Sequence, residues 1–418
     1  MKNETRIGAI WLGAVVAYSV AIGVMGGCGS STPAPDALAS PDASISPSPS
    51  ASATPGAGGS GGTGGSPDSS ASPSATPSAA ATAAAGVYAA GTSQDSGGND
   101  APGYWKDGAW NLLPRVDLTK GATATSLVVS GGSVYVGGTS HSSDIVAVPG
   151  VWIGGTWNAL TPLVSGKTCT VNAIALSGGS VYAAGTSTNS SDQSVPGYWK
   201  DGAWNALTPL DITKVSYVTS IAVSGGSVYV GGFSSNSSNQ TVPGYWKDGS
   251  WNALSTPNLN VANAVNSITI SGGVVYAAGF SSTGGSIAIP GYWIGGSRTD
   301  LTPLNSSWNS AVKSIIVSGG VVYAAGYSNS TAPLSVAGYW QDTVWHGLTP
   351  PDATQSSGVN SIVVSGGSVY AAGYSSTAAR NPSPPITVPG YWKDGTWVGL
   401  TPSVAGKSAV VNSIVVVQ

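Results

Sequence analysis

The sequence repeats itself at a fixed interval from residue 86 to its end. A tyrosine that follows valine recurs every 47 residues, at Tyr88, Tyr135, Tyr182, Tyr229, Tyr276, Tyr323 and Tyr370. A tryptophan recurs beside it, with five steps of 47 residues and a last step of 52, at Trp105, Trp152, Trp199, Trp246, Trp293, Trp340 and Trp392. A period of this length indicates a chain built from one repeated supersecondary unit.

Each repeat has the pattern of four short β-strands. In one repeat the four predicted strands are Ser220–Ser224, Val228–Phe233, Pro243–Lys247 and Trp251–Leu254. Gly225-Gly226 joins the first pair, because glycine accepts the positive φ that a two-residue hairpin needs. Asp248-Gly249 is an equally strong turn signal for the last pair. No window after residue 85 has helical periodicity, so four antiparallel strands per repeat predict the blade of a β-propeller.

The two ends of the repeat region complement each other. The first repeat begins with its second strand, at Gly86-Val87-Tyr88, and the last repeat is followed by an extra first strand, Val411–Gln418. Pairing these two segments would close a ring and leave no long unpaired strand edge. We therefore predict an all-β, seven-bladed β-propeller over residues 86–418, monomeric and closed by its C-terminal strand in the first blade.

Residues 1–28 have the features of an export signal. Lys2 and Arg6 precede an uncharged apolar run over residues 7–24, and small residues lead to Cys28. The stretch from Val24 to Cys28 resembles the lipobox of bacterial lipoproteins. That resemblance implies cleavage before Cys28, acylation of its sulfur and anchoring at the outer membrane or the cell surface. An uncleaved membrane helix is the alternative, since 18 apolar residues are close to the minimum that spans a bilayer.

Residues 29–85 predict a disordered tether. They are almost entirely Ser, Pro, Ala, Gly and Thr, so they hold too few large apolar groups to offset the entropy lost on ordering. Such a segment would hold a folded domain away from a membrane.

The composition argues against several classes of function. Charged residues make up only 7% of the chain and the net charge is −3, so no basic surface is expected for nucleic acid. The two cysteines, Cys28 and Cys169, form no disulfide framework if Cys28 is acylated. His141 and His346 are isolated in the sequence, and no cluster has the spacing of metal ligands. We expect neither a metal nor another cofactor.

The repeat resembles two known groups. The Gly-Gly that ends the second strand, with Tyr245 and then Trp251 six residues later, resembles the kelch repeat. Residues 86–418 as a whole are similar to bacterial envelope lipoproteins with YWKDG and VYAAG repeats, a family of unassigned function. Both resemblances imply a propeller, and neither implies a ligand.

Propeller geometry divides the connections between two faces. The turns between first and second strands, and between third and fourth strands, lie on one face and hardly vary; the other loops share the opposite face and differ in sequence, as a recognition surface would. A polar residue near the start of each first strand is expected to line the mouth of a central channel on that face: Thr125, Asn172, Thr219, Asn266, Lys313, Asn360 and Asn412. The alternative is that these side chains satisfy backbone groups or hold water.

The variable face loses its symmetry in the last three repeats. Lys313 replaces the usual Asn or Thr, Trp308 is an additional tryptophan, and Arg380 lies in a longer loop. These three residues could form a pocket for an anion or a sugar. The alternative is that the sequence has drifted without a function, and that Trp308 fills space locally. Arg298 replaces the fourth-strand tryptophan, and its position predicts a place nearer the opposite face. The other repeated aromatic residues are interpreted as packing between blades.

Two functions from different classes follow. The first is a non-enzymatic binding or scaffold propeller at the cell envelope, which recognises a protein or a glycan through the variable face. The alternative is a propeller enzyme of lyase or glycosidase type that acts on extracytoplasmic polysaccharide. That enzyme would need paired acids, whereas acids such as Asp192 and Asp211 occur singly. The sequence favours the binding function.

Overall fold

The computed structural model describes residues 84–143, 146–282, 287–331, 334–378 and 385–418. The predicted signal peptide with Cys28, the tether up to residue 83, and Arg380 lie outside these residues. Within the described residues every regular element is a β-strand. A search of the same residues for a helix long and apolar enough to cross a membrane found none.

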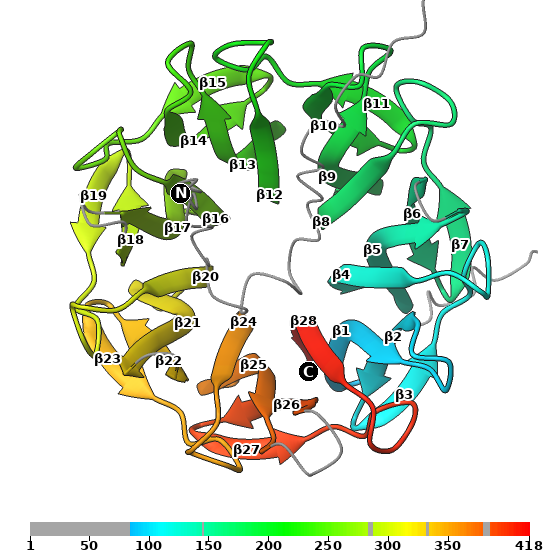
Figure 1. Cartoon of the computed structure of the whole chain (residues 1–418), viewed down its shortest axis with the longest axis vertical. Helices are drawn as coiled ribbons and strands as arrows, with labels where there is room; N and C mark the ends of the chain where they lie inside the picture. Colours follow the sequence, from blue (N-terminus) through cyan, green and yellow to red (C-terminus); the bar gives the residue numbers. More distant parts are fainter. Residues whose placement is uncertain (1–83, 144–145, 283–286, 332–333, 379–384) are drawn as a thin grey trace, which may run out of the picture. The chain divides into compact units, whose positions relative to one another are not determined.

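The strands form seven four-stranded antiparallel sheets arranged as a ring, which confirms the predicted propeller (Figure 1). We number the sheets as blades 1 to 7, starting with β28-β1-β2-β3. The first strands surround the ring axis, and they are β4 (Ala122–Ser130), β8 (Cys169–Ser177), β12 (Ser216–Ser224), β16 (Asn263–Ser271), β20 (Ser310–Ser318), β24 (Ser357–Ser365) and β28 (Ala409–Val417).

The remaining strands follow outward within each blade. The second strands are β1 (Gly86–Gln94), β5 (Ser133–His141), β9 (Ser180–Thr188), β13 (Ser227–Ser235), β17 (Val274–Ser282), β21 (Val321–Thr331) and β25 (Ser368–Ser376). The third strands are β2 (Asp100–Lys106), β6 (Ala147–Ile153), β10 (Ser194–Lys200), β14 (Thr241–Lys247), β18 (Ala288–Ile294), β22 (Leu334–Gln341) and β26 (Thr387–Lys393). The outermost strands are β3 (Ala109–Leu112), β7 (Thr156–Ala159), β11 (Ala203–Ala206), β15 (Ser250–Ala253), β19 (Ser297–Asp300), β23 (Val344–Gly347) and β27 (Thr396–Gly399).

The turns on one side of the ring, which we call the turn face, use the predicted residues. Gly225 and Gly226 have φ values of 57° and 80°, as a primed hairpin turn requires. At the second turn of the same blade, the Asp248 carboxylate accepts a 2.8 Å hydrogen bond from the Val228 backbone N–H. Lys247 lies 5.4 Å from the centre of the Tyr229 ring. The Lys-Asp-Gly segments are therefore turns, with the aspartate in a structural role. The opposite side of the ring, which carries the longer loops, is called the loop face.

The C-terminal strand closes the ring as predicted. β28 pairs antiparallel with β1, with Tyr88 opposite Val415. Loop atoms reinforce the closure, because the Ser403 backbone N–H donates to the Ser93 hydroxyl at 2.8 Å across 310 residues of sequence. Blade 1 is thus assembled from both ends of the repeat region.

The third-strand tryptophans form the centre of the packing between blades. All seven have no exposed surface, and they are Trp105, Trp152, Trp199, Trp246, Trp293, Trp340 and Trp392. Each indole N–H also donates to a backbone carbonyl of the preceding blade or its following loop; Trp246 donates to the Thr208 carbonyl at 2.7 Å. The packing interpretation of these aromatic residues is confirmed, because buried tryptophan usually finds an acceptor.

A β-bulge in every first strand positions a glycine of the second strand. In blade 4 the pairing of β12 with β13 skips one residue between Val218 and Ser220. The bulge brings the Tyr217 carbonyl against Gly232, where an added Cβ would lie 1.9 Å from the carbonyl oxygen. Glycine is therefore required here, and it occupies the equivalent position in all seven blades.

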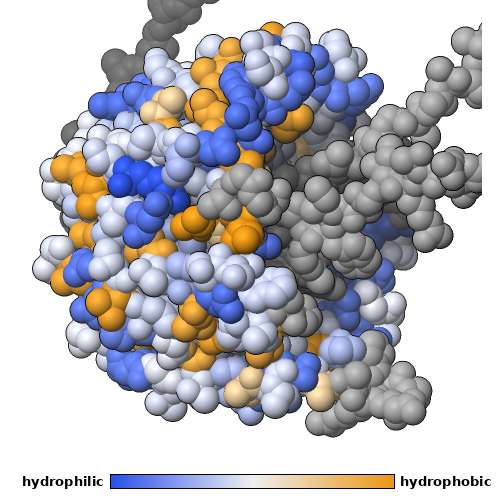
Figure 2. Space-filling view, turned by 60° about the vertical axis from the view of Figure 1, so that its left-hand side comes forward, coloured by the Kyte–Doolittle hydropathy of each residue, from blue (hydrophilic) through white to orange (hydrophobic). Residues whose placement is uncertain are grey.

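The surface of the ring is polar without being highly charged. On the side that Figure 2 shows, apolar residues form small groups among residues of intermediate or hydrophilic character. The low fraction of charged residues is consistent with this appearance, since Gly, Ser, Thr and Asn supply much of the polar surface.

Candidate functional site

The predicted polar ring consists of the bulge residues of the first strands. The first strands begin earlier than their apolar runs suggested; β12, for example, begins at Ser216 and not at Ser220, so the ring residues lie within the inner wall and not at the strand ends. Six of the seven donate a hydrogen bond to a backbone carbonyl of the next blade. The six are Thr125, Asn172, Thr219, Asn266, Asn360 and Asn412, with donor–acceptor distances of 2.6–2.9 Å.

This belt of hydrogen bonds gives the ring residues a structural role. Asn266, for example, donates its amide N–H to the Val312 carbonyl at 2.6 Å. Buried carbonyls need such partners, so these donors join neighbouring blades. The geometry favours the alternative of backbone satisfaction, and ligand binding by these six side chains stays a prediction.

Lys313 interrupts the belt between blades 6 and 7. It occupies the bulge of β20, and no hydrogen bond or ion pair links its ammonium group to another described residue. Burial alone lowers the pKa of Lys313, while the residue keeps partial exposure along the inner wall. By analogy with Asn266 and Asn360, an asparagine at position 313 would donate to the Val359 carbonyl.

We expect Lys313→Asn to stabilise the protein. The amide would restore the missing inter-blade hydrogen bond, with a gain of about 1 kcal/mol, and would remove a partly desolvated charge. Because the folded protein binds this proton less tightly than the unfolded chain, the stability of the natural protein rises with pH as Lys313 deprotonates. The advantage of Lys313→Asn should therefore narrow above neutral pH.

Urea unfolding from pH 7 to pH 10 measures this difference. Asn266→Ala is the matched control in the belt, and it should lose about 1 kcal/mol at every pH. If Lys313→Asn and the natural protein are equally stable at pH 7, Lys313 does not interrupt a stabilising belt of hydrogen bonds.

Trp308 lies on the loop face, as predicted, with 39% of its surface exposed. It is the last residue of the turn that follows blade 5, where its backbone N–H donates to the Asn305 carbonyl at 3.2 Å. No contact between Trp308 and Lys313 is among the described interactions, and Arg380 lies outside the described residues. The predicted three-residue pocket is therefore not assembled by the described part of the chain.

Exposed apolar side chains gather in consecutive loops of the loop face. The loops that join blades 1 to 6 carry Val116, Leu118, Leu163, Leu210, Ile212, Val215, Leu259, Leu304 and Trp308, each 37–71% exposed. The same loops lie at matching positions around the ring. Contiguous apolar patches, and not single side chains, are typical of interaction surfaces; the loop between blades 3 and 4 carries three of these residues, Leu210, Ile212 and Val215.

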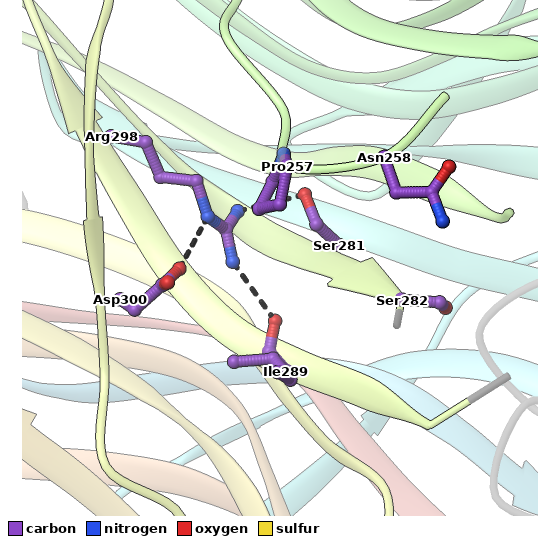
Figure 3. A pocket seen from close by; sticks show the side chains of 7 residues that line it. All are labelled: Pro257, Asn258, Ser281, Ser282, Ile289, Arg298 and Asp300. Atoms are coloured by element: carbon purple, nitrogen blue, oxygen red, sulfur yellow. Dashed lines mark hydrogen bonds and ion pairs between the residues drawn. The ribbon is translucent and has the colours of Figure 1, made fainter. Parts of the chain in front are cut away.

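A pocket opens in blade 5 beside Arg298 (Figure 3). It encloses about 290 Å³, and its lining residues are Pro257, Asn258, Ser281, Ser282, Ile289, Arg298 and Asp300. The Arg298 side chain is only 7% exposed, while that of Asp300 is 57% exposed. Because Ser282 ends β17 and Pro257 belongs to an inter-blade loop, the pocket is on the loop-face side of the blade.

Three hydrogen bonds hold the Arg298 guanidinium. Its Nε donates to Asp300, Nη1 donates to the Ser281 hydroxyl at 2.9 Å, and Nη2 donates to the Ile289 carbonyl at 3.2 Å. The guanidinium also lies 4.8 Å from the centre of the Trp293 ring. The sequence had identified Arg298 as a break in symmetry and placed it near the turn face. That placement was wrong for the side chain, which extends toward the loop face.

A second group of titratable residues lies between blades 1 and 2. Arg115 forms a 2.9 Å ion pair with Asp95. Burial and the nearby Asp95 carboxylate raise the pKa of Asp100, which His141 opposes. The described residues contain no group of three or more His, Cys, Asp or Glu side chains that could hold a metal ion. Of the two carboxylates, Asp95 is thus paired with Arg115, while Asp100 is the more buried.

Cys169 has a local structural explanation. It occupies the first position of β8, where other blades have Ser216 or Ser310, and its thiol lies 3.0 Å from the Ser187 hydroxyl. Ser216 makes the equivalent contact with Ser234 at 2.8 Å. Cys169 thus substitutes for a serine in a buried pair.

The fold defines the class of this protein, a seven-bladed β-propeller with an arginine pocket on one blade. No model of a known protein family and no curated protein matches its sequence. Among solved structures, it is similar to a puromycin-hydrolysing peptidase of Mycobacterium tuberculosis, with 13% identity and a TM-score of 0.49 over 78% of this chain. The chain spans about half of that peptidase, 52%.

Two further solved structures are also similar. One is an arginine-to-alanine triple mutant of AofleA from Arthrobotrys oligospora, with 12% identity, a TM-score of 0.39, and coverage of 66% of this chain and 89% of that one. The other is the six-bladed fucose-recognising lectin of Aleuria aurantia, with 14% identity, a TM-score of 0.37, and coverage of 64% and 92%. Similarities at this level assign neither a ligand nor an activity to this chain.

Proposed function

We propose that this protein is a non-enzymatic binding propeller of a bacterial cell envelope, which recognises a glycan through its loop face. One observation carries the proposal. The loop face holds both the pocket at Arg298 and the exposed side chains of the inter-blade loops, whereas the turn face consists of short turns that are nearly the same in every blade. A concave site with a few convergent polar groups is typical of ligand recognition.

Anchoring at the envelope is the second part of this proposal. Its support is the lipobox-like sequence that ends at Cys28 and the Ser/Pro/Ala/Gly-rich segment that follows. Dual or triple acylation gives stable membrane attachment. Cys28→Ala should release the protein from the membrane fraction and prevent incorporation of a labelled fatty acid. Membrane attachment that survives Cys28→Ala would favour an uncleaved membrane helix.

The binding function is tested with the full-length protein on an array of neutral and acidic oligosaccharides. We expect at least one glycan to bind, and we expect that binding to survive Leu118→Ser combined with Ile212→Ser, because these two exposed side chains lie outside the pocket. Absence of any glycan ligand would contradict the proposal. Lys247→Ser on the turn face is the control, and this variant should keep its glycan binding.

A protein partner is the second candidate, and the exposed apolar side chains of the inter-blade loops favour it. If the glycan array shows no ligand and the double substitution Leu118→Ser, Ile212→Ser abolishes binding to a purified envelope protein, this candidate replaces the first. For the enzyme alternative, Asp100 is the acid to test, because burial and the charge of Asp95 raise its pKa, although Asp95 itself forms an ion pair with Arg115. Release of new reducing ends from a bound polysaccharide, abolished by Asp100→Asn, would establish it.

A further inference from the structure

Arg298, which lines the pocket of blade 5, stands where the other six blades have a tryptophan. In the other blades the fourth-strand tryptophan lies over a third-strand glycine. In blade 4, for example, an added Cβ at Gly244 would meet the Trp251 ring at 2.5 Å, and the Trp251 and Trp246 rings are 4.4 Å apart. Arg298 covers Gly291 and Trp293 in the same way. Its slimmer side chain leaves the outer part of the space open.

A second substitution in this blade changes the hydrogen bonding beside Arg298. In five other blades, a backbone N–H of the preceding loop donates to the serine that corresponds to Ser281, as from Leu210 to Ser234 at 2.8 Å. Pro257 has no N–H at this position. The Ser281 hydroxyl instead accepts from Arg298 at 2.9 Å and from the Thr256 hydroxyl at 3.3 Å.

Blade 7 shows that the fold does not need an arginine after this proline. There Pro351 likewise removes the backbone donor, and the Ser375 hydroxyl has no partner among the described residues. Blade 7 nevertheless keeps its tryptophan, Trp397, which packs 4.5 Å from Trp392. Because the tryptophan is tolerated in this context, hydrogen bonding to Ser281 alone does not explain Arg298.

The pocket retains donors and acceptors that the protein does not use. A guanidinium carries five N–H groups, and three of those of Arg298 have the partners described above, which leaves two. The Asn258 side chain accepts from the Asn260 backbone N–H at 2.9 Å, and its amide nitrogen donates to none of the described residues. Asp300 is more than half exposed and accepts one hydrogen bond, from Arg298. Figure 3 shows these groups around one opening, with Pro257 and Ile289 beside them.

The charges of the pocket select the class of ligand. Arg298 and Asp300 neutralise each other, so the site has no net charge with which to attract an anion. An arginine donor next to a carboxylate acceptor can instead bind two neighbouring hydroxyl groups, one as acceptor and one as donor. The volume of about 290 Å³ lies at the small end of ligand pockets and accommodates one ring-sized unit.

We infer that the blade 5 pocket binds a single neutral sugar residue of a glycan, with Arg298 and Asp300 bound to adjacent hydroxyl groups. This inference rests on the proposed glycan-binding function and assigns the site and the ligand class within it. Pro257 and Ile289 would contact the apolar face of the sugar ring.

Arg298→Trp is the sharpest test, because it restores the residue that the other blades use. The variant should fold with equal or higher thermal stability, while the indole fills the pocket. On the oligosaccharide array, and in calorimetric titration with the best neutral oligosaccharide found there, we expect affinity to fall at least a hundredfold. Asp300→Asn, which keeps the volume, should lower that affinity about tenfold, as expected for one charge-assisted hydrogen bond.

Trp308→Ala is the matched control on the loop face, outside the pocket, and should bind like the natural protein. If Arg298→Trp binds the glycan normally, the pocket assignment is wrong while the proposed function stands, and loss in Trp308→Ala would then place the site at that loop. If acidic glycans bind in preference to neutral ones, the ligand class is wrong. If no glycan binds the natural protein, the inference and the proposed glycan-binding function both fail.

Discussion

Gly232→Ala is expected to prevent blade 4 from forming its native sheet. The new methyl group would lie 1.9 Å from the Tyr217 carbonyl oxygen. Residues 217 and 232 belong to the paired strands β12 and β13, next to the bulge. Neither strand can move without breaking its ladder of hydrogen bonds. We expect a loss of more than about 4 kcal/mol, measured by urea unfolding or, if the variant does not fold, by the loss of soluble protein.

The neighbouring Gly231→Ala provides a matched control. A methyl group at Gly231 would meet only side chains, with the Val265 Cγ1 at 3.1 Å as its nearest contact. Five of the seven blades have alanine at this position, among them Ala278 and Ala325. Stability should therefore change by less than about 1 kcal/mol. Similar effects of the two substitutions would show that the bulge does not impose the glycine.

Deletion of residues 409–418 is the second change with a large expected effect. It removes β28, which is the inner strand of blade 1 and also contacts its neighbours: Asn412 donates to the Ala124 carbonyl at 2.8 Å, and the Ser413 hydroxyl accepts from the Leu127 N–H at 3.1 Å. The unpaired edge of β1 would then be open to other chains. We expect loss of the single cooperative unfolding transition, together with aggregation, measured by scanning calorimetry and light scattering.

Two controls accompany the deletion. Removal of Gln418 alone leaves β28 intact, since the strand ends at Val417, and should have little effect. A peptide of residues 409–418 added to the truncated chain should restore the transition, whereas a peptide of scrambled sequence should not. A truncated chain that unfolds at the natural temperature would show that ring closure contributes little.

The sequence was sufficient for the architecture because the repeat makes each element visible seven times. Turn glycines, the tryptophan of the third strand and the orphan strand at Val411–Gln418 all have local signals, and the structure confirms each of them. The bulge had no such signal. The segments that begin the first strands, such as Ser216–Val218, mix polar and apolar side chains. The predicted strands were therefore shorter than the observed ones.

The candidate site was harder to predict, for two physical reasons. Side-chain amides such as that of Asn172 look alike in the sequence whether they face a ligand or the carbonyl of the next blade. The position of Arg298 in the sequence locates its Cα and not its guanidinium, which reaches Ser281 and Ile289 at the other end of the blade. Sequence reasoning missed the combination of Arg298 with Pro257, an inter-blade loop residue that lines the same pocket.

The pairing of β1 with β28 has a consequence for how the protein is made. During synthesis, β1, β2 and β3 leave the ribosome first, and the strand that completes their sheet is translated last. Until then the nascent chain presents an open β-edge that must be kept from other chains. Chaperones that bind the unfolded chain should therefore be more important for this protein than for a propeller whose first sheet is completed early in translation.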